Sequence, residues 1–205
     1  EELEMELDDS RLDELLDAAG EATRSGRPDL LPVLVSQHAG AVRDGAGADL
    51  SGFAKIVSRD DALTIARIGH AVFDKLHTSR VPTFAFINGL ALGGGLELTL
   101  HCHFRTVSAA ASGIALPECS LSLFPGWGGA FIVPNLIGAE RAVQLIIENP
   151  LNQNRMLTGP QVYELGLADA IFDGADFLAR SLDWARQVVT GSVAISRPDV
   201  DRGPA

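Results

Sequence analysis

Cysteine is scarce in this sequence, which holds only Cys102 and Cys119. Two cysteines cannot form a disulfide framework, and these two do not form a CxxC pair of the kind that binds zinc or carries redox chemistry. We expect both thiols to act as small buried hydrophobic groups in a reducing compartment, which favours a cytoplasmic protein.

Basic residues are also few, since 16 Lys plus Arg stand against 27 Asp plus Glu, for a formal net charge of −11. An acidic surface repels a phosphate backbone, so nucleic acid is not an expected partner. Every long apolar stretch is broken by Gly, Glu or His before it could span a bilayer, and the acidic segment 1–9 does not resemble a signal peptide. No membrane partner is predicted.

Three common nucleotide-binding and hydrolase motifs are missing. Leu98 stands where a GxGxxG dinucleotide fingerprint starting at Gly93 would need a glycine. Neither Lys55 nor Lys75 follows a glycine, as the P-loop requires. The absence of a GxSxG segment removes the commonest serine-hydrolase signature.

The remaining composition is that of a globular protein, with 46% hydrophobic and 21% charged residues. Apolar residues recur at helical spacing in some segments and form short β-rich runs in others. The predicted helices are 10–19, 61–76, 96–100, a segment around 142–147, 158–166 and 176–189, and the predicted strands are 30–36, 81–87, 104–108, 114–116 and 167–172. This alternation predicts an α/β fold with parallel pairing, in one domain that covers 1–205 with its core at about 30–189.

Three consecutive glycines, 93–95, lie between an apolar strand and a predicted helix. Backbone N–H groups at a helix N-terminus are unpaired, and glycine lets a ligand oxygen approach them closely. Such a turn can bind a phosphate or the developing oxyanion of an acyl group. Alternatively, the glycines only allow close helix–strand packing. The small-residue loop 46–49 is, taken alone, an ordinary surface turn.

Two glutamates stand in apolar surroundings. Glu97 lies within the segment Leu96–Leu100, and Glu118 follows Ala115-Leu116-Pro117. Buried glutamates need a partner or a task, and desolvation raises the pKa of a carboxyl group toward the range that suits a general acid or base. A structural ion pair or a solvated strand end is the alternative for each.

The histidines and the tryptophan near these glutamates are expected to have structural roles. His101 and His103 are two residues apart, so they diverge on a helix, and no further ligands follow at metal spacing. No metal site is therefore predicted. Trp127, in Pro125-Gly-Trp-Gly-Gly129, is expected to be a packing residue, while the glycines around it suggest backbone close to a ligand.

Taken in order, these segments resemble the crotonase (enoyl-CoA hydratase/isomerase) superfamily. The matching segments are AGADLSGF at 46–53, VPTFAFINGLALGGGLEL at 81–98, LPECSLSLFPGWGG at 116–129 and LTGPQVYELGLADAIF at 157–172. The resemblance implies a crotonase-type spiral of ββα units, here with short or missing terminal elements. Ser51 stands where the family often has a lysine.

The resemblance also implies the site. The N–H groups of Ala48 and Gly94 would form an oxyanion hole for the thioester carbonyl. Glu97 and Glu118 would hold the water between them, one activating it and the other supplying a proton. Gly126 would lie near that water. The segment that lines the CoA moiety would include Ala46, Asp49 and Leu50.

The expected reaction is hydration of trans-2-enoyl-CoA to 3-hydroxyacyl-CoA in fatty acid β-oxidation. Coenzyme A enters as part of the substrate, and no other cofactor is expected. The family resemblance further implies a homotrimer or a dimer of trimers. Two alternatives stay open: an enoyl-CoA isomerase or another crotonase-type reaction, and a catalytically silent acyl-CoA-binding protein.

Overall fold

The computed structural model describes residues 33–37, 57–197 and 200, with the backbone alone for the first of these ranges. The strands are β1 (Val33–Gln37), β2 (Phe84–Ile87), β3 (Ala91–Leu92), β4 (Phe104–Ser108), β5 (Ser112–Ala115), β6 (Leu157–Thr158) and β7 (Ala170–Phe172). The helices are α2 (Arg59–Thr78), α3 (Gly94–His101), α4 (Gly129–Ile137), α5 (Ala139–Val143), α6 (Asn149–Leu151), α7 (Gly159–Leu165) and α8 (Phe177–Val189), together with the 3-10 helix η2 (Pro117–Leu121) and the π-helix η3 (Gln144–Glu148). Among the described residues, none of the helices combines the length and apolarity needed to cross a bilayer.

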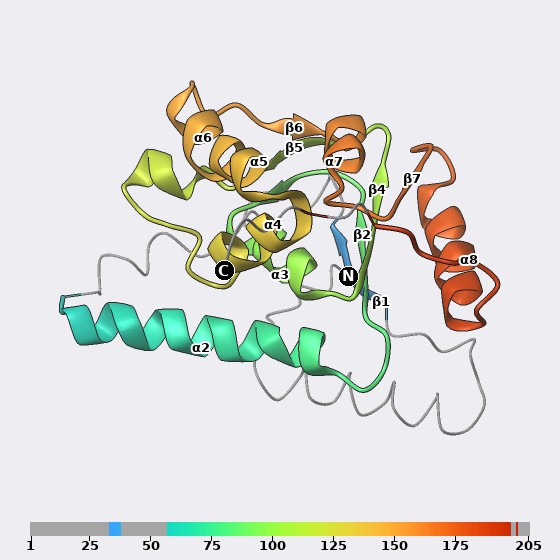
Figure 1. The fold of residues 1–205 in the computed structure, drawn as a ribbon, viewed down its shortest axis with the longest axis horizontal. Helices are drawn as coiled ribbons and strands as arrows, with labels where there is room; N and C mark the ends of the chain where they lie inside the picture. The colour runs from blue at the N-terminus through green and yellow to red at the C-terminus, as the bar shows by residue number, and fades with distance from the viewer. Residues whose placement is uncertain (1–32, 38–56, 198–199, 201–205) are drawn as a thin grey trace, which may run out of the picture.

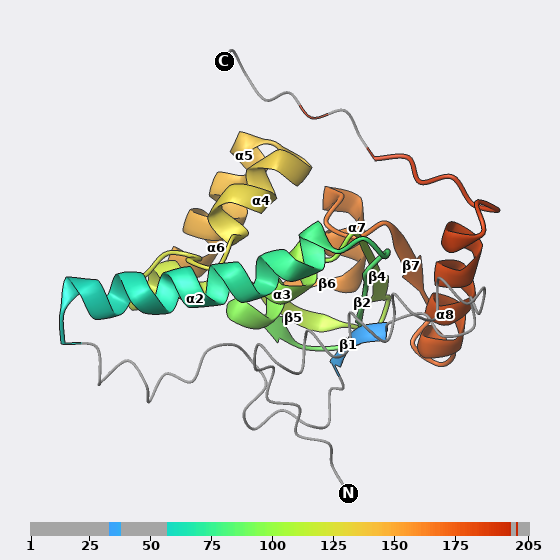
Figure 2. The same ribbon diagram turned by 90° about the horizontal axis from the view of Figure 1, so that it is seen from below.

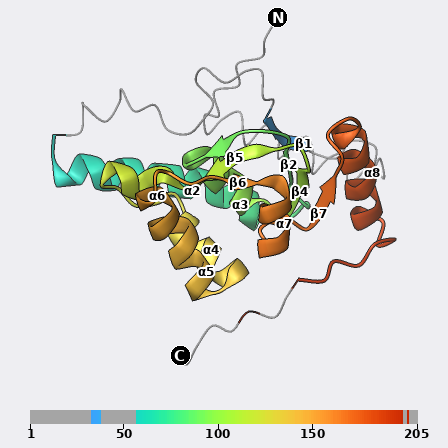
Figure 3. The ribbon, with the colours of Figure 1, turned by 90° about the horizontal axis from the view of Figure 1, so that it is seen from above.

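The strands form two small sheets. The first has the order β1-β2-β4-β7 with every pair parallel, and Phe84 to Ile87 of β2 lie opposite Phe104 to Val107 of β4. The second has the order β3-β5-β6, in which β3 and β5 are parallel and β5 and β6 antiparallel. Figure 1 shows α2 along one side of the molecule and α8 beside β7. Helices α4, α5 and α6 project to one side in Figures 2 and 3.

Helix α3 occupies the centre of this arrangement and contacts α2, α4, β2 and β3. All eight of its residues are buried, which agrees with its lack of a polar face. Leu96 and Leu100 of α3 pack with Ile114 of β5 and Val133 of α4 in the largest hydrophobic cluster. The helix therefore holds its few polar side chains in a fixed, largely water-free setting.

Most of the predicted elements are confirmed. The strand 104–108 has the predicted bounds, and the main sheet is parallel as expected. The capping box at Thr158 is present, because the Oε1 atom of Gln161 accepts the N–H of Thr158 at 2.9 Å, and the helix ends at Gly166. The predicted helix 10–19 lies outside the described residues.

Helix α4 was not predicted. Its sequence GAFIVPNLI contains Pro134, has no polar face and follows a glycine-rich turn, so nothing in its own pattern favours a helix. Contacts with the rest of the fold stabilise the helix instead. One of them is a hydrogen bond from the N–H of its first residue, Gly129, to the carboxylate of Glu97.

Candidate active site

Glu97 points from α3 into the loop that precedes α4. Its Oε1 atom accepts the backbone N–H of Trp127 at 2.8 Å and that of Gly129 at 2.9 Å. The carboxylate thus sits at the N-terminus of α4, where the helix dipole favours negative charge. Both donors share Oε1, so Oε2 accepts no hydrogen bond from the described part of the chain.

The side chain of Glu97 is 2% exposed. Burial raises the pKa of Glu97 above its usual value, while the N–H groups of Gly129 and Trp127 oppose the rise by stabilising the ionised form. A carboxylate in this setting is a stronger base than one in water, and its Oε2 lone pairs remain available.

Glu118 lies in η2, which follows β5. Its Oε2 atom is buried and has no hydrogen-bond partner within the described residues. Burial raises the pKa of Glu118 to about 7, and the charge of Glu97 adds to the rise. The two carboxyl groups therefore interact electrostatically, and Glu118 exchanges its proton near neutral pH.

The carboxyl group of Glu118 also lies against the glycine turn that starts α3. A Cβ on Gly93 would stand 2.9 Å from its Oε1 atom, and Gly93 has φ +52°, a conformation that other residues rarely adopt. Gly93 offers no side chain to cap α3, so the N–H groups of Gly94 and Gly95 in the first turn are not capped from within the helix. A ligand oxygen can use them.

His101 fixes the same loop from the other end of α3. Four residues after Glu97, it lies on the same helix face, and its Nε2 atom is 2.7 Å from the carbonyl oxygen of Trp127. A carbonyl only accepts, so Nε2 carries a proton. Burial lowers the pKa of His101, and its Nδ1 atom is buried without a partner in the described residues, which also favours the neutral ring.

The backbone of Trp127 thus makes two hydrogen bonds to α3. Its N–H donates to Glu97, and its carbonyl accepts from His101. Its ring contacts Phe73 of α2 edge-on, and its indole N–H donates to the carbonyl of Ile65 at 3.3 Å. The predicted packing role of Trp127 is confirmed, and its peptide in addition orients the carboxylate of Glu97.

Part of the predicted site lies within the described residues. Glu97, Glu118 and Gly94 lie around the start of α3, and Gly126 directly precedes Trp127, whose N–H donates to Glu97. Ala46, Ala48, Asp49 and Leu50 lie outside the described residues. Within 57–197 no three His, Cys, Asp or Glu side chains gather as a metal would require.

The sequence did not predict that the N–H groups of Trp127 and Gly129 donate to Glu97, or that His101 holds the same loop. From sequence, His101 was considered only as a metal ligand paired with His103, two residues away. The spacing of four between Glu97 and His101 was the available signal, because it puts both side chains on one face of a helix.

Three comparisons place the chain among known proteins. The sequence profile described as enoyl-CoA hydratase/isomerase matches residues 44–198. The peroxisomal fatty acid beta-oxidation multifunctional protein MFP2 of Arabidopsis thaliana is 32% identical over 167 residues, covering 80% of this chain and 22% of the relative. A fatty acid oxidation complex subunit alpha of Shewanella amazonensis is 37% identical over 146 residues, covering 68% of this chain and 19% of the relative.

Among solved structures, the enoyl-CoA hydratase of Bacillus anthracis has a TM-score of 0.61 at 30% identity, covering 71% of this chain and 54% of that one. The chain spans about a fifth of the length of the curated relatives cited here. Its fold is the crotonase fold that the sequence predicted. The profile match over three quarters of its residues shows that this chain belongs to the enoyl-CoA hydratase/isomerase family.

Proposed function

We propose that this chain hydrates trans-2-enoyl-CoA to 3-hydroxyacyl-CoA, with Glu97 and Glu118 on either side of the added water. One observation carries the proposal: two interacting carboxyl groups beside the first turn of α3 each keep an oxygen free of hydrogen bonds from the described residues. Such oxygens can bind the water, accept a proton from it and donate a proton to the substrate. The family, and the β-oxidation names of the relatives, support an acyl-CoA thioester as the substrate.

The two glutamates divide the proton transfers between them. Glu97 is stabilised as a carboxylate by two N–H donors, so its Oε2 is suited to take a proton from water. Glu118, with a pKa of about 7, is suited to deliver one. The water oxygen bonds to C3, a water proton moves to Glu97, and the proton of Glu118 moves to C2. One water is added in all, and proton exchange with solvent resets both carboxyl groups.

Backbone donors would stabilise the enolate that forms during attack. Gly94 supplies one N–H from the uncapped start of α3, and Ala48 is proposed to supply the second. Charge develops on the thioester oxygen mainly in the transition state, so fixed donors lower the barrier more than they tighten substrate binding. In other enzymes one such donor contributes on the order of 3 kcal/mol.

The remaining predictions belong to the same proposal. Ala46, Asp49 and Leu50 would line the CoA moiety, and Gly126 would lie near the water. The addition of water changes no overall oxidation state, so coenzyme A in the substrate is the only group the reaction needs. We also propose fatty acid β-oxidation as the pathway and a homotrimer or a dimer of trimers as the assembly.

The test follows the loss of the enoyl-thioester absorbance with crotonyl-CoA and a longer trans-2-enoyl-CoA. Wild type is compared with Glu97→Gln, Glu118→Gln and the control Glu148→Gln, which changes an exposed glutamate. We expect turnover in wild type and control, and a loss of about 10²–10⁴ in each active-site variant. All four proteins are first shown to be folded.

Two results would overturn the hydratase assignment. Conversion of a 3-enoyl-CoA to a 2-enoyl-CoA without hydration would identify an isomerase. Binding of acyl-CoA without turnover at any chain length would identify a silent binding protein.

A further inference from the structure

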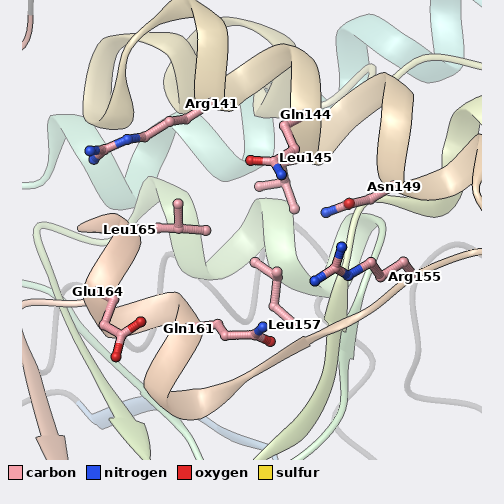
Figure 4. Close-up of a pocket in the computed structure, with 9 residues that line it drawn as sticks. All are labelled: Arg141, Gln144, Leu145, Asn149, Arg155, Leu157, Gln161, Glu164 and Leu165. Carbon is pink, nitrogen blue, oxygen red and sulfur yellow. The ribbon is translucent and has the colours of Figure 1, made fainter.

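A cavity of about 250 Å³ lies between α5, η3 and α6 on one side and β6 and α7 on the other. Neither Glu97 nor Glu118 lines it. Its floor is apolar, since Leu145 and Leu157 are 1% and 6% exposed. Figure 4 shows the polar ends of Gln144, Asn149 and Arg155 turned toward one space.

Asn149 is the buried polar residue of this cavity. It is only 6% exposed, yet its carboxamide makes no hydrogen bond with the described part of the chain. Buried carboxamides normally have partners, so one without a partner in the described chain that faces a cavity is available to water or to a ligand there. Two N–H donors and one carbonyl acceptor are available there.

Arg155 is exposed at the mouth of the cavity and lies beside Asn149. Its guanidinium makes no ion pair or hydrogen bond with the described residues, although the chain carries 27 acidic side chains. The cavity does contain one carboxylate, that of Glu164, but Figure 4 shows it with Arg141 on the opposite side. The Arg155 end of the cavity is therefore electropositive.

The backbone holds these two groups in a fixed relation. The N–H of Arg155 donates to the carbonyl of Asn149 at 2.9 Å, and the N–H of Asn154 donates to that of Pro150 at 3.2 Å. Gln153 and Asn154 both have φ 54°, which completes the tight turn. The turn thus fixes the backbone positions from which Asn149 and Arg155 reach the cavity.

We propose that this cavity binds a small carboxylate with a short apolar chain. The guanidinium of Arg155 would take the two carboxylate oxygens, and the carboxamide of Asn149 would donate to one of them. The apolar part would lie over Leu145 and Leu157. Inorganic phosphate matches the guanidinium but gains nothing from the leucine floor, so a carboxylate fits the lining better. This site does not depend on the function proposed for the glutamates.

The test measures the melting temperature of the 205-residue chain against increasing butyrate, with sodium chloride at the same ionic strength as the reference. We expect a saturable rise that corresponds to a Kd on the order of 1 mM. Arg155→Gln should weaken binding roughly tenfold or more. Asn149→Asp, which places a negative charge beside the carboxylate, should abolish the rise. Each variant is compared with its own melting temperature without butyrate.

Two further variants separate this site from other anion effects. Arg180→Gln removes an exposed arginine of α8 that is outside the cavity and should bind butyrate like wild type. Glu118→Gln should also keep the rise, so a failed hydratase assay leaves this test intact. Crystals soaked in butyrate should show it between Arg155 and Asn149. An equal rise in Arg155→Gln, an equal rise with chloride, or equal affinity for inorganic phosphate would overturn the proposal.

Discussion

Replacing Glu118 by glutamine should stabilise the protein above neutral pH, because folding makes this carboxyl group harder to ionise. The pKa of Glu118 rises from 4.5 to about 7 on burial. Below pH 4.5 the carboxyl is protonated in both the folded and the unfolded chain, so it adds no penalty. Between pH 4.5 and 7 the unfolded chain releases the proton while the folded chain keeps it, so stability falls as pH rises.

The size of the effect follows from this difference. A rise from 4.5 to about 7 corresponds to at most about 3 kcal/mol of lost stability above pH 7. Glu118 is only partly buried, and water screens the charge, so we expect about 1–2 kcal/mol in practice. Glutamine keeps the shape of the side chain and never ionises, which removes the penalty.

The assay is urea unfolding of wild type and Glu118→Gln at pH 5 and at pH 8. The variant should be more stable at pH 8, and its advantage should shrink at pH 5. The exposed Glu140 provides the control Glu140→Gln, whose stability difference from wild type should not follow this pattern. A Glu118→Gln variant that is no more stable than wild type at pH 8 would refute the reasoning.

Two further predictions concern the groups around the glutamates. His101→Ala removes the donor to the carbonyl of Trp127 and leaves a cavity, so we expect a loss of about 2–4 kcal/mol in urea unfolding and a lower kcat. An unchanged kcat would show that the loop does not need this hydrogen bond. Gly93→Ala places a Cβ 2.9 Å from the Oε1 atom of Glu118 at φ +52°, which should cost about 1–3 kcal/mol and displace the carboxyl group, with a loss of activity. Gly191→Ala has a similar φ of +72° but nothing within 4 Å, so it should lose stability alone; equal activity of the two variants would contradict the prediction.

Local patterns predicted the elements that carry their own signals. Helix α7 has its capping box at Thr158 and its glycine stop at Gly166, and α2 has an apolar stripe, so each could be placed from its own residues. Both glutamates were predicted because carboxyl groups in apolar segments are rare. Their meeting at one place came from the family resemblance, not from spacing.

Helix α4 and the role of His101 depend on tertiary contacts, which local sequence patterns do not predict. Helix α4 contains a proline and receives its N-terminal hydrogen-bond acceptor from Glu97, which lies 32 residues before Gly129. No local rule links residues so far apart. The role of His101 depends in the same way on a loop 26 residues later. These long-range hydrogen bonds both stabilise the fold and orient the carboxylate of Glu97, so neither effect can be predicted from a short segment of sequence.

The most direct test of the proposed function follows the atoms of the added water. Crotonyl-CoA is incubated with the protein in water enriched in ¹⁸O and, separately, in ²H₂O, and the product is analysed by mass spectrometry. The proposal predicts 3-hydroxybutyryl-CoA with one ¹⁸O at C3 in the first case and one deuterium at C2 in the second. Unchanged substrate, or a product without ¹⁸O at C3, would contradict it.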